Sequence, residues 1–208
     1  MEKVNYQIVL DKKIEEISKL EKRPRLLLHS CCAPCSSSVL EYLNRYFSIT
    51  LYYYNPNISP KAEFEKRFSE LEKFCSLAGY GDDVRVLRGS YEAELFESLA
   101  KGLENEAEGG SRCEKCYRLR IEKTAQTARA EGFDYFTTTL SVSPHKNAQK
   151  LNRIGKEAAE QYKVEYLFAD FKKKDGYKRS CELSREYGLY RQNYCGCKYS
   201  KMLYEAKG

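Results

Sequence analysis

The sequence predicts an α/β fold in which helices cover both faces of a mainly parallel sheet, a three-layer α/β/α sandwich. Short apolar or β-branched segments, such as 25–29 and 48–54, alternate along the chain with longer helical patterns. This alternation is typical of βαβ units, whose crossover helices lie on the faces of a parallel sheet. With 208 residues the chain is long enough for one domain with a full core, so we expect a single α/β domain over residues 1–208.

The expected elements of the N-terminal half follow from apolar periodicity. They are a helix from about Asp11 to Glu21, a strand over 25–29, a helix with Val39, Leu40, Leu43 and Tyr46 on its apolar face, a strand over 48–54 and a helix over 61–79. Phe64, Phe68 and Leu71 fall on one stripe of the last helix. Gly79 suits the position just after its end, because glycine readily adopts the left-handed backbone that ends helices.

The C-terminal half continues the pattern and then departs from it. We expect a strand over 83–87, a helix over 91–103, a loop over 104–112, a helix over 113–131, a strand over 133–138, a loop over 139–147, a helix over 148–162 and a strand over 164–168. Residues 170–208 are predicted to form a basic C-terminal extension that bears tyrosines and cysteines, with helices over 179–187 and 198–206. Cys195 and Cys197 of this extension are expected to complete a metal site.

The N-terminus has no apolar leader, and no apolar run is long enough to cross a bilayer. We therefore expect a soluble, cytoplasmic protein with no membrane partner. Nine cysteines are many for a reducing compartment, where thiols bind metals or catalyse reactions more often than they form disulfides.

The net charge of +6 is modest, but the basic residues of the extension are interleaved with tyrosines. Basic side chains attract phosphates and aromatic rings stack on unpaired bases, so this mixture favours single-stranded or loop RNA. An ordinary solvated surface is the alternative. The candidate phosphate contacts are Lys172, Lys173, Lys174, Arg179, Arg185 and Arg191.

Seven of the nine cysteines form three compact groups, each at a predicted loop or helix start. The groups are Cys31, Cys32 and Cys35; Cys113 and Cys116; and Cys195 and Cys197. Closely spaced thiolates can bind one metal centre, and seven exceed the four that a zinc ion or one cubane requires. The surplus indicates a cluster with a second metal, or a cluster with redox or catalytic thiols. A CxxC pair alone leaves zinc, iron–sulfur and dithiol roles open. Cys75 and Cys181 are isolated, and we expect them to be structural.

Three further residues have a functional and a structural interpretation. His29 ends a strand and is either a hydrogen-bonded core histidine or a contact to a cluster sulfur. His145 lies in the loop after the fourth strand, where we favour a proton donor or substrate contact. Asp170 is either a metal-site carboxylate or a turn or helix cap.

The segments HSCCAPCSS, CEKCYRLR, LSVSPHKN and LYRQNYCGCKYS occur in this order. With these segments the chain resembles, over nearly its whole length, the QueH family of cobalamin-independent epoxyqueuosine reductases. The resemblance implies a nucleotide α-hydrolase-like fold and an iron–sulfur enzyme of queuosine synthesis. Its substrate would be tRNA, in which the epoxycyclopentane of the wobble base loses its oxygen. Folds of this type often bind ATP at a glycine-rich loop after the first strand. Here cysteines fill that loop, so no ATP is expected.

The resemblance also implies a metal centre. We expect a [4Fe–4S] cluster held mainly by Cys113, Cys116 and members of the other two groups, with the remaining thiolates holding an additional mononuclear iron. His29 and Asp170 are further candidate contacts to these cofactors. Removing an epoxide oxygen takes two electrons, so an external electron donor is required. Protons are expected from His145, Lys146 or Tyr194.

Two alternative functions use the same sequence features. One is an ATP-dependent tRNA-thiolating or pyrophosphatase-type enzyme of the same fold, which ATP-dependent activity would reveal. The other is a structural zinc protein that binds RNA. Anaerobically purified protein would be colourless with zinc and brown with an iron–sulfur cluster.

Overall fold

The computed structural model describes residues 4–80 and 83–205, in which five parallel strands form one sheet in the order β3-β2-β1-β4-β5. The strands are β1 (Arg25–His29), β2 (Ser48–Tyr53), β3 (Arg85–Arg88), β4 (Tyr135–Thr138) and β5 (Glu165–Tyr166). The predicted α/β class and parallel sheet are confirmed.

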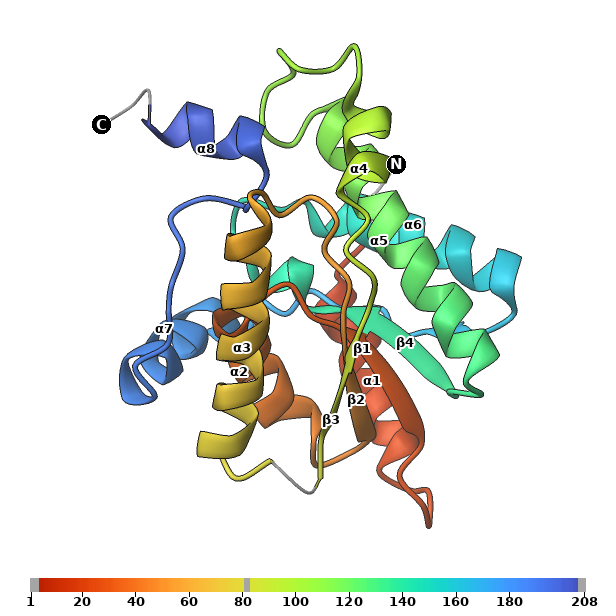
Figure 1. The fold of residues 1–208 in the computed structure, drawn as a ribbon. Coiled ribbons are helices and arrows are strands. Elements are labelled where there is room, and N and C mark those ends of the chain that lie inside the picture. The colour runs from red at the N-terminus through yellow and green to blue at the C-terminus, as the bar shows by residue number, and fades with distance from the viewer. Residues whose placement is uncertain (1–3, 81–82, 206–208) are drawn as a thin grey trace.

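Eight α-helices and one 3-10 turn accompany the sheet in the described residues. They are α1 (Tyr6–Ile17), α2 (Ala33–Leu43), α3 (Lys61–Leu77), α4 (Ala93–Ala100), α5 (Ser111–Ala130), η1 (Thr139–Val142), α6 (Ala148–Tyr162), α7 (Gly176–Glu186) and α8 (Lys198–Glu205). Figure 1 shows α2 and α3 on one side of the strands and α5 and α6 on the other.

The two faces of the sheet pack against different helices because side chains alternate along each strand. Leu26 and Leu28 belong to the core that contains residues of α1, α2 and α3, whereas Leu27 belongs to the core with α5 and α6. All three leucines have no exposed surface. This explains the continuous apolar run, since a strand of a parallel sheet is buried on both faces.

Some boundaries differ from the sequence-based expectation. The leading helix spans Tyr6–Ile17 rather than 11–21. It begins earlier because the Asn5 side chain accepts a hydrogen bond from the backbone N–H of Gln7 and so caps the helix N-terminus. In the extension, α7 begins at Gly176, three residues before the predicted start. The predicted strand over 25–29 and the helix over 148–162 are confirmed. Residues 206–208, which include the predicted end of the last helix, lie outside the described part.

The strand order determines where a site can form. The chain passes from β1 to β2 on one side and reaches β4 on the other side of β1, so the loops after β1 and β4 diverge from neighbouring strand ends. Such a switch point at the carboxyl edge is where ligands bind in open α/β sheets. The two loops meet here, with Cys31 Sγ 3.8 Å from Thr139 Oγ1.

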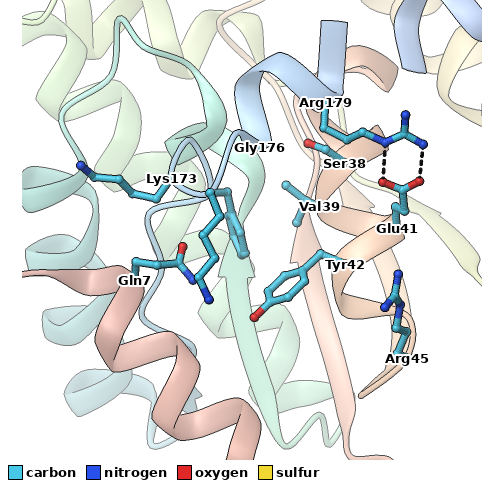
Figure 2. A pocket seen from close by; sticks show the side chains of 11 residues that line it. Gln7, Ser38, Val39, Glu41, Tyr42, Arg45, Lys173, Gly176 and Arg179 are labelled. Carbon is cyan, nitrogen blue, oxygen red and sulfur yellow. Dashed lines mark hydrogen bonds and ion pairs between the residues drawn. The ribbon is translucent and has the colours of Figure 1, made fainter. Parts of the chain in front are cut away.

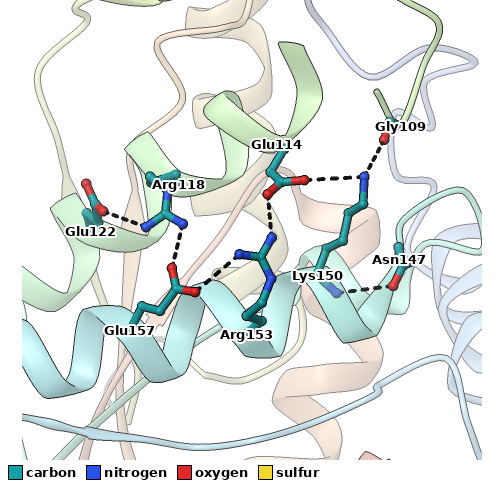
Figure 3. Close-up of polar contacts among 8 residues, drawn as sticks. All are labelled: Gly109, Glu114, Arg118, Glu122, Asn147, Lys150, Arg153 and Glu157. Carbon is teal, nitrogen blue, oxygen red and sulfur yellow. Dashed lines mark hydrogen bonds and ion pairs between the residues drawn. The ribbon is translucent and has the colours of Figure 1, made fainter. Parts of the chain in front are cut away.

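An ion-pair network between α5 and α6 fixes the position of the first turns of α5 (Figure 3). Glu114 contacts Lys150 and Arg153 of α6, and Arg118 contacts Glu157 at 2.5 Å. Isolated surface pairs contribute little, but this network joins these five charged residues across two helices next to Cys113 and Cys116.

No helix in residues 4–80 and 83–205 combines the length and apolar character needed to cross a bilayer.

A close contact between α6 and β5 gives a stability prediction. A Cβ atom on Gly155 would lie 2.3 Å from Cζ of Tyr166, a distance that forces the buried ring to move. We expect Gly155→Ala to destabilise the protein by about 1–3 kcal/mol, because overpacking outweighs the gain of roughly 1 kcal/mol in helix propensity. Urea denaturation measures the difference. The double variant Gly155→Ala/Tyr166→Leu should lose less stability than the sum of the two single variants, and strict additivity would contradict this interpretation.

Candidate metal centre

Cys31, Cys32 and Cys35 form a tight group of sulfur atoms at the carboxyl end of β1. Their Sγ atoms all lie within 4.8 Å of one another, and those of Cys31 and Cys32 are 3.7 Å apart. Four sulfurs placed tetrahedrally at about 2.3 Å from one ion would be roughly 3.8 Å apart. The spacing of this cysteine triad therefore suits a single metal ion.

The turn that presents the triad is held by its own hydroxyls. Cys32 is the N-cap residue of α2 and Pro34 occupies the first helical turn, where its missing N–H costs nothing. Ser36 Oγ donates to the Cys32 carbonyl at 2.9 Å and lies 2.6 Å from Ser30 Oγ. The three cysteines are thus fixed by a buried serine pair.

A second set of cysteines lines a cavity next to the first turns of α5. Cys113 and Cys116 come from α5, and Cys195 and Cys197 come from the segment before α8. Among the described residues only the triad has all its Sγ atoms within 4.8 Å of one another. The sulfur atoms of this cysteine tetrad are therefore spread more widely. Cys195 and Cys197 of the extension therefore lie beside the CxxC pair.

Two cationic side chains interact with both sets of thiols. Arg120 is 1% exposed, and its Nη2 donates to Asn55 Oδ1 at 2.5 Å. Burial alone would lower the pKa of Arg120, but the sulfurs of Cys116 and Cys31 raise it. Lys146 is half-buried; burial likewise opposes its charge, and the thiolates of Cys195 and Cys31 raise its pKa above the ordinary value. Both side chains stay charged beside the sulfurs.

The thiols are not equally ready to ionise. Hydrogen bonds from Cys32 and Cys35, aided by Arg120 and Lys146, hold the pKa of Cys31 well below its usual range. Donation to Cys31 raises the pKa of Cys32 to about 12. In the tetrad, burial raises the pKa of Cys116 to about 11 and that of Cys197 to about 12. Cys31 is therefore the first thiol of the triad to become a thiolate.

His29 is placed as a hydrogen-bonded core residue. It has no exposed surface, Nδ1 lies 2.8 Å from Thr138 Oγ1, and Nε2 lies 3.1 Å from the Tyr54 carbonyl. Burial, followed by the charge of Arg120, lowers the pKa of His29 to about 3, so the ring is neutral. Both ring nitrogens are occupied by these partners rather than by a cysteine sulfur.

The other predicted site residues lie in different surroundings. His145 is exposed on the loop after η1, and its backbone N–H donates to Ser143 Oγ. Tyr194 is half-buried, with its ring 5.4 Å from Cζ of Arg67. Asp170 makes an ion pair with Lys172. Among the described residues, the closely spaced group of potential metal ligands is the cysteine triad, and Asp170 does not belong to it. Of the three predicted proton donors, Lys146 has the closest electrostatic link to the thiols.

Four polar residues next to the cysteines were not predicted from the sequence: Asn55, Asn57, Arg67 and Arg120. Asn55 and Asn57 follow β2 at the same sheet edge as the triad, and Arg120 is one helical turn beyond Cys116. Two features of the sequence could have identified three of these residues. Asn55 and Asn57 directly follow a predicted strand, and Arg120 lies four residues after Cys116, on the same face of a predicted helix.

Three of the six basic residues predicted to contact phosphates make internal ion pairs. Lys172 pairs with Asp170, Lys174 with Asp11, and Arg179 binds Glu41 through two contacts of 2.8 and 2.6 Å (Figure 2). Within the described residues Lys173, Arg185 and Arg191 have no ion-pair partner, although Arg191 donates hydrogen bonds to Ser180 and Ser184. Lys173 borders a cavity of about 200 Å³ between α1, α2 and α7, which the unpaired hydroxyl of Ser38 also lines.

The fold is similar to that of a solved structure, the U34-tRNA thiolase NcsA from Methanococcus maripaludis with its [4Fe-4S] cluster. The TM-score is 0.55 at 14% sequence identity, over 97% of this chain and 70% of that chain. At this identity the similarity shows the fold alone, and it confirms the predicted nucleotide α-hydrolase-like architecture.

Sequence comparisons show the family. The family model described as "Epoxyqueuosine reductase QueH" matches residues 26–202. A relative of that name from Streptococcus pyogenes serotype M1 is 44% identical over 201 residues, which are 96% of this chain and 79% of the relative. Another, from Staphylococcus epidermidis, is 43% identical over 205 residues, or 97% of this chain and 86% of the relative. Because the match covers most of the chain and joins the segments that hold all seven grouped cysteines, the chain belongs to the QueH family.

Proposed function

We propose that the chain is an epoxyqueuosine reductase, which removes the epoxide oxygen from the modified wobble base of tRNA and leaves an alkene. The observation that carries the proposal is the gathering of seven cysteines, as a triad and a tetrad, at the carboxyl edge of the sheet in a chain of this family. The reaction consumes two electrons and two protons and releases one water molecule. The electrons must come from an external donor.

The tetrad is the proposed site of the [4Fe–4S] cluster. Four cysteines match the ligand number of a cubane, and their wider spacing agrees with a group larger than one ion. The free space between them is about 10 Å³, close to one water molecule, so the thiols must turn outward to admit a cluster. The buried side chains of Asn57 and Arg112 line this cavity with unpaired polar atoms, which suits a polar group there.

The triad is the proposed site of the additional mononuclear iron, because its sulfur spacing suits one ion. When bound, the cluster would supply electrons one at a time and the iron would act as a Lewis acid toward the epoxide oxygen. The proposal leaves Asp170 out of both sites, since it pairs with Lys172.

The protein's own contribution centres on Lys146 and Arg120. Lys146 keeps its proton beside Cys195 and Cys31. Because its raised pKa makes it a weak acid, its Nζ would give up this proton only as negative charge builds up on the departing oxygen. Arg120 stays charged and buried between α5 and β1, where it offsets the negative charge of the thiolates. Neither role requires ATP, and we expect turnover without it.

Grouped cysteine substitutions test the division of the metals. Cys113→Ala/Cys116→Ala should remove the brown colour and most of the iron, because two of the four cluster ligands are lost. Cys31→Ala/Cys35→Ala should keep the colour and lose about one iron per chain. Iron analysis and visible spectra of anaerobically reconstituted protein measure both effects. Loss of the colour in the second variant but not in the first would reverse the assignment.

Substitution of Lys146 tests the proton donor. With metal content unchanged, Lys146→Met should slow deoxygenation by about 10²–10⁴-fold, the usual contribution of a positioned acid. The measurement is single-turnover conversion of a tRNA anticodon stem-loop, followed by mass spectrometry for the loss of one oxygen. His145→Gln is the control, because His145 is exposed and should affect the rate much less. Equal rates for Lys146→Met and the unsubstituted protein would exclude this role.

The cations of the extension that have no ion-pair partner should contribute to RNA binding. We expect Lys173→Gln/Arg185→Gln to weaken binding and to reduce the slope of log K against log salt by about 0.7 for each lost phosphate contact. Cluster content should not change. Lys156→Gln on α6 is the control, since Lys156 is exposed on the opposite face of the sheet. The test is stem-loop binding at several salt concentrations, and an unchanged slope in the double variant would refute the assignment.

A further inference from the structure

Asn57 is a buried side chain whose amide makes no hydrogen bond with the protein. It is 1% exposed, and neither Nδ2 nor Oδ1 has a partner among the described residues. An unpaired buried amide is costly and therefore uncommon in folded proteins. Asn57 lines the cavity of the cysteine tetrad, so its unpaired groups adjoin the proposed cluster site.

The neighbouring Asn55 shows that this is not a general property of the segment. Asn55 has no exposed surface either, but its Nδ2 donates to the Ser30 carbonyl at 2.9 Å and its Oδ1 accepts from Arg120. Asn55 thus holds the loop after β2 to β1, while the amide of Asn57 contributes no bond to the fold.

The backbone around Asn57 is fixed to the segment that carries Cys195. The Ser59 N–H donates to the Gly196 carbonyl at 2.9 Å, and Arg67 Nη1 donates to the Cys195 carbonyl at 3.2 Å. Gly196 has φ +114°, and a Cβ there would lie 3.0 Å from Ile58 and 2.9 Å from Arg67. The close approach of these segments keeps Asn57 beside the tetrad.

Two arginines add unpaired donors to the same region. Arg112 lines the cavity and is 3% exposed, and its Nε has no partner; Arg67, 2% exposed, has an unpaired Nη2. Arg112 Nη1 donates to the Leu103 and Glu104 carbonyls. Arg67 Nε donates to Glu63, and its Nη1 donates to the Cys195 carbonyl. The cavity is therefore lined by two donors without a partner in the described part of the chain, Asn57 Nδ2 and Arg112 Nε, and Arg67, which is bound to the Cys195 carbonyl, adds a third in the same region.

We infer that Asn57 is a positioning residue that donates a hydrogen bond from its amide to a sulfur of the iron–sulfur group in the tetrad cavity, in surroundings made positive by Arg67 and Arg112. The inference rests on the proposed function, which puts a cluster there. Sulfide and thiolate sulfurs accept hydrogen bonds, and such bonds are among the factors that set cluster potentials. A donor stabilises the reduced, more negative state, so Asn57 raises the reduction potential.

The first test uses the metal-free protein. Asn57→Leu keeps the size of the side chain and removes the unpaired amide, so its midpoint in urea should equal or exceed that of the unsubstituted protein. Asn55→Leu removes two made hydrogen bonds and should lower the midpoint. A loss in Asn57→Leu as large as that in Asn55→Leu would show that the amide serves the fold and would overturn the inference.

The second test uses anaerobically reconstituted protein and a redox titration followed by electron paramagnetic resonance. Asn57→Leu should shift the equilibrium at least tenfold toward the oxidised cluster, which is about 59 mV for a one-electron couple. Asn44→Leu is the matched control, because Asn44 also has a buried, unpaired Oδ1 but lies at the end of α2, and it should leave the potential unchanged.

The remaining outcomes separate this inference from the proposed function. If the unsubstituted protein acquires no iron–sulfur chromophore, both are overturned. If the chromophore forms and Asn57→Leu has the same potential, only the inference fails. If Asn57→Leu acquires no cluster, Asn57→Ser decides: a cluster in this variant, which keeps a donor, supports the inference, and its absence overturns it.

Discussion

The buried guanidinium of Arg120 is the interaction on which the arrangement of the site depends. It lies on α5, donates to Asn55 after β2, and its Nε is 3.3 Å from Nε2 of His29 at the end of β1. Removing a charged group from water is expensive unless it is paired and hydrogen-bonded. Here the Asn55 amide oxygen, the neutral imidazole of His29 and the thiolate of Cys31 compensate the charge. One side chain thereby fixes the helix that carries Cys113 and Cys116 to the two strand ends beside the triad.

The part of this arrangement that the sequence predicts is the part set by local patterns. The run Leu26–Leu28 identifies the central strand because both of its faces are buried, and the helix over 148–162 follows from its apolar stripe. The division of the cysteines into three and four was not predictable, because it depends on where the extension packs. Asn55 and Asn57 also look alike in sequence. Only their surroundings show that one amide is satisfied and the other is not.

The composition of the C-terminal extension suggests RNA binding, but the ion pairs within the protein limit which of its cations can take part. Its cations favour RNA, yet Arg179 is held by Glu41 of α2 and Lys174 by Asp11 of α1. These pairs attach one end of the extension to the helices on one face of the sheet. The other end is attached where Gly196 and Cys195 meet Ser59 and Arg67. Part of the positive charge of the extension therefore attaches it to α1 and α2, and only the remaining part is available for phosphates.

Charge balance also determines how the centre can be loaded. Four cationic side chains lie near the seven thiols: Arg67, Arg112, Arg120 and the half-buried Lys146. If all seven thiols were ionised, the negative charges would outnumber these cations by three. The raised pKa values of Cys32, Cys116 and Cys197 agree with this limit, since these thiols keep their protons near neutral pH. Metal ligation requires thiolates and so releases protons. The low pKa of Cys31 provides one thiolate before any metal arrives, and each later ligand must lose its proton as the positive charge of the metal replaces it.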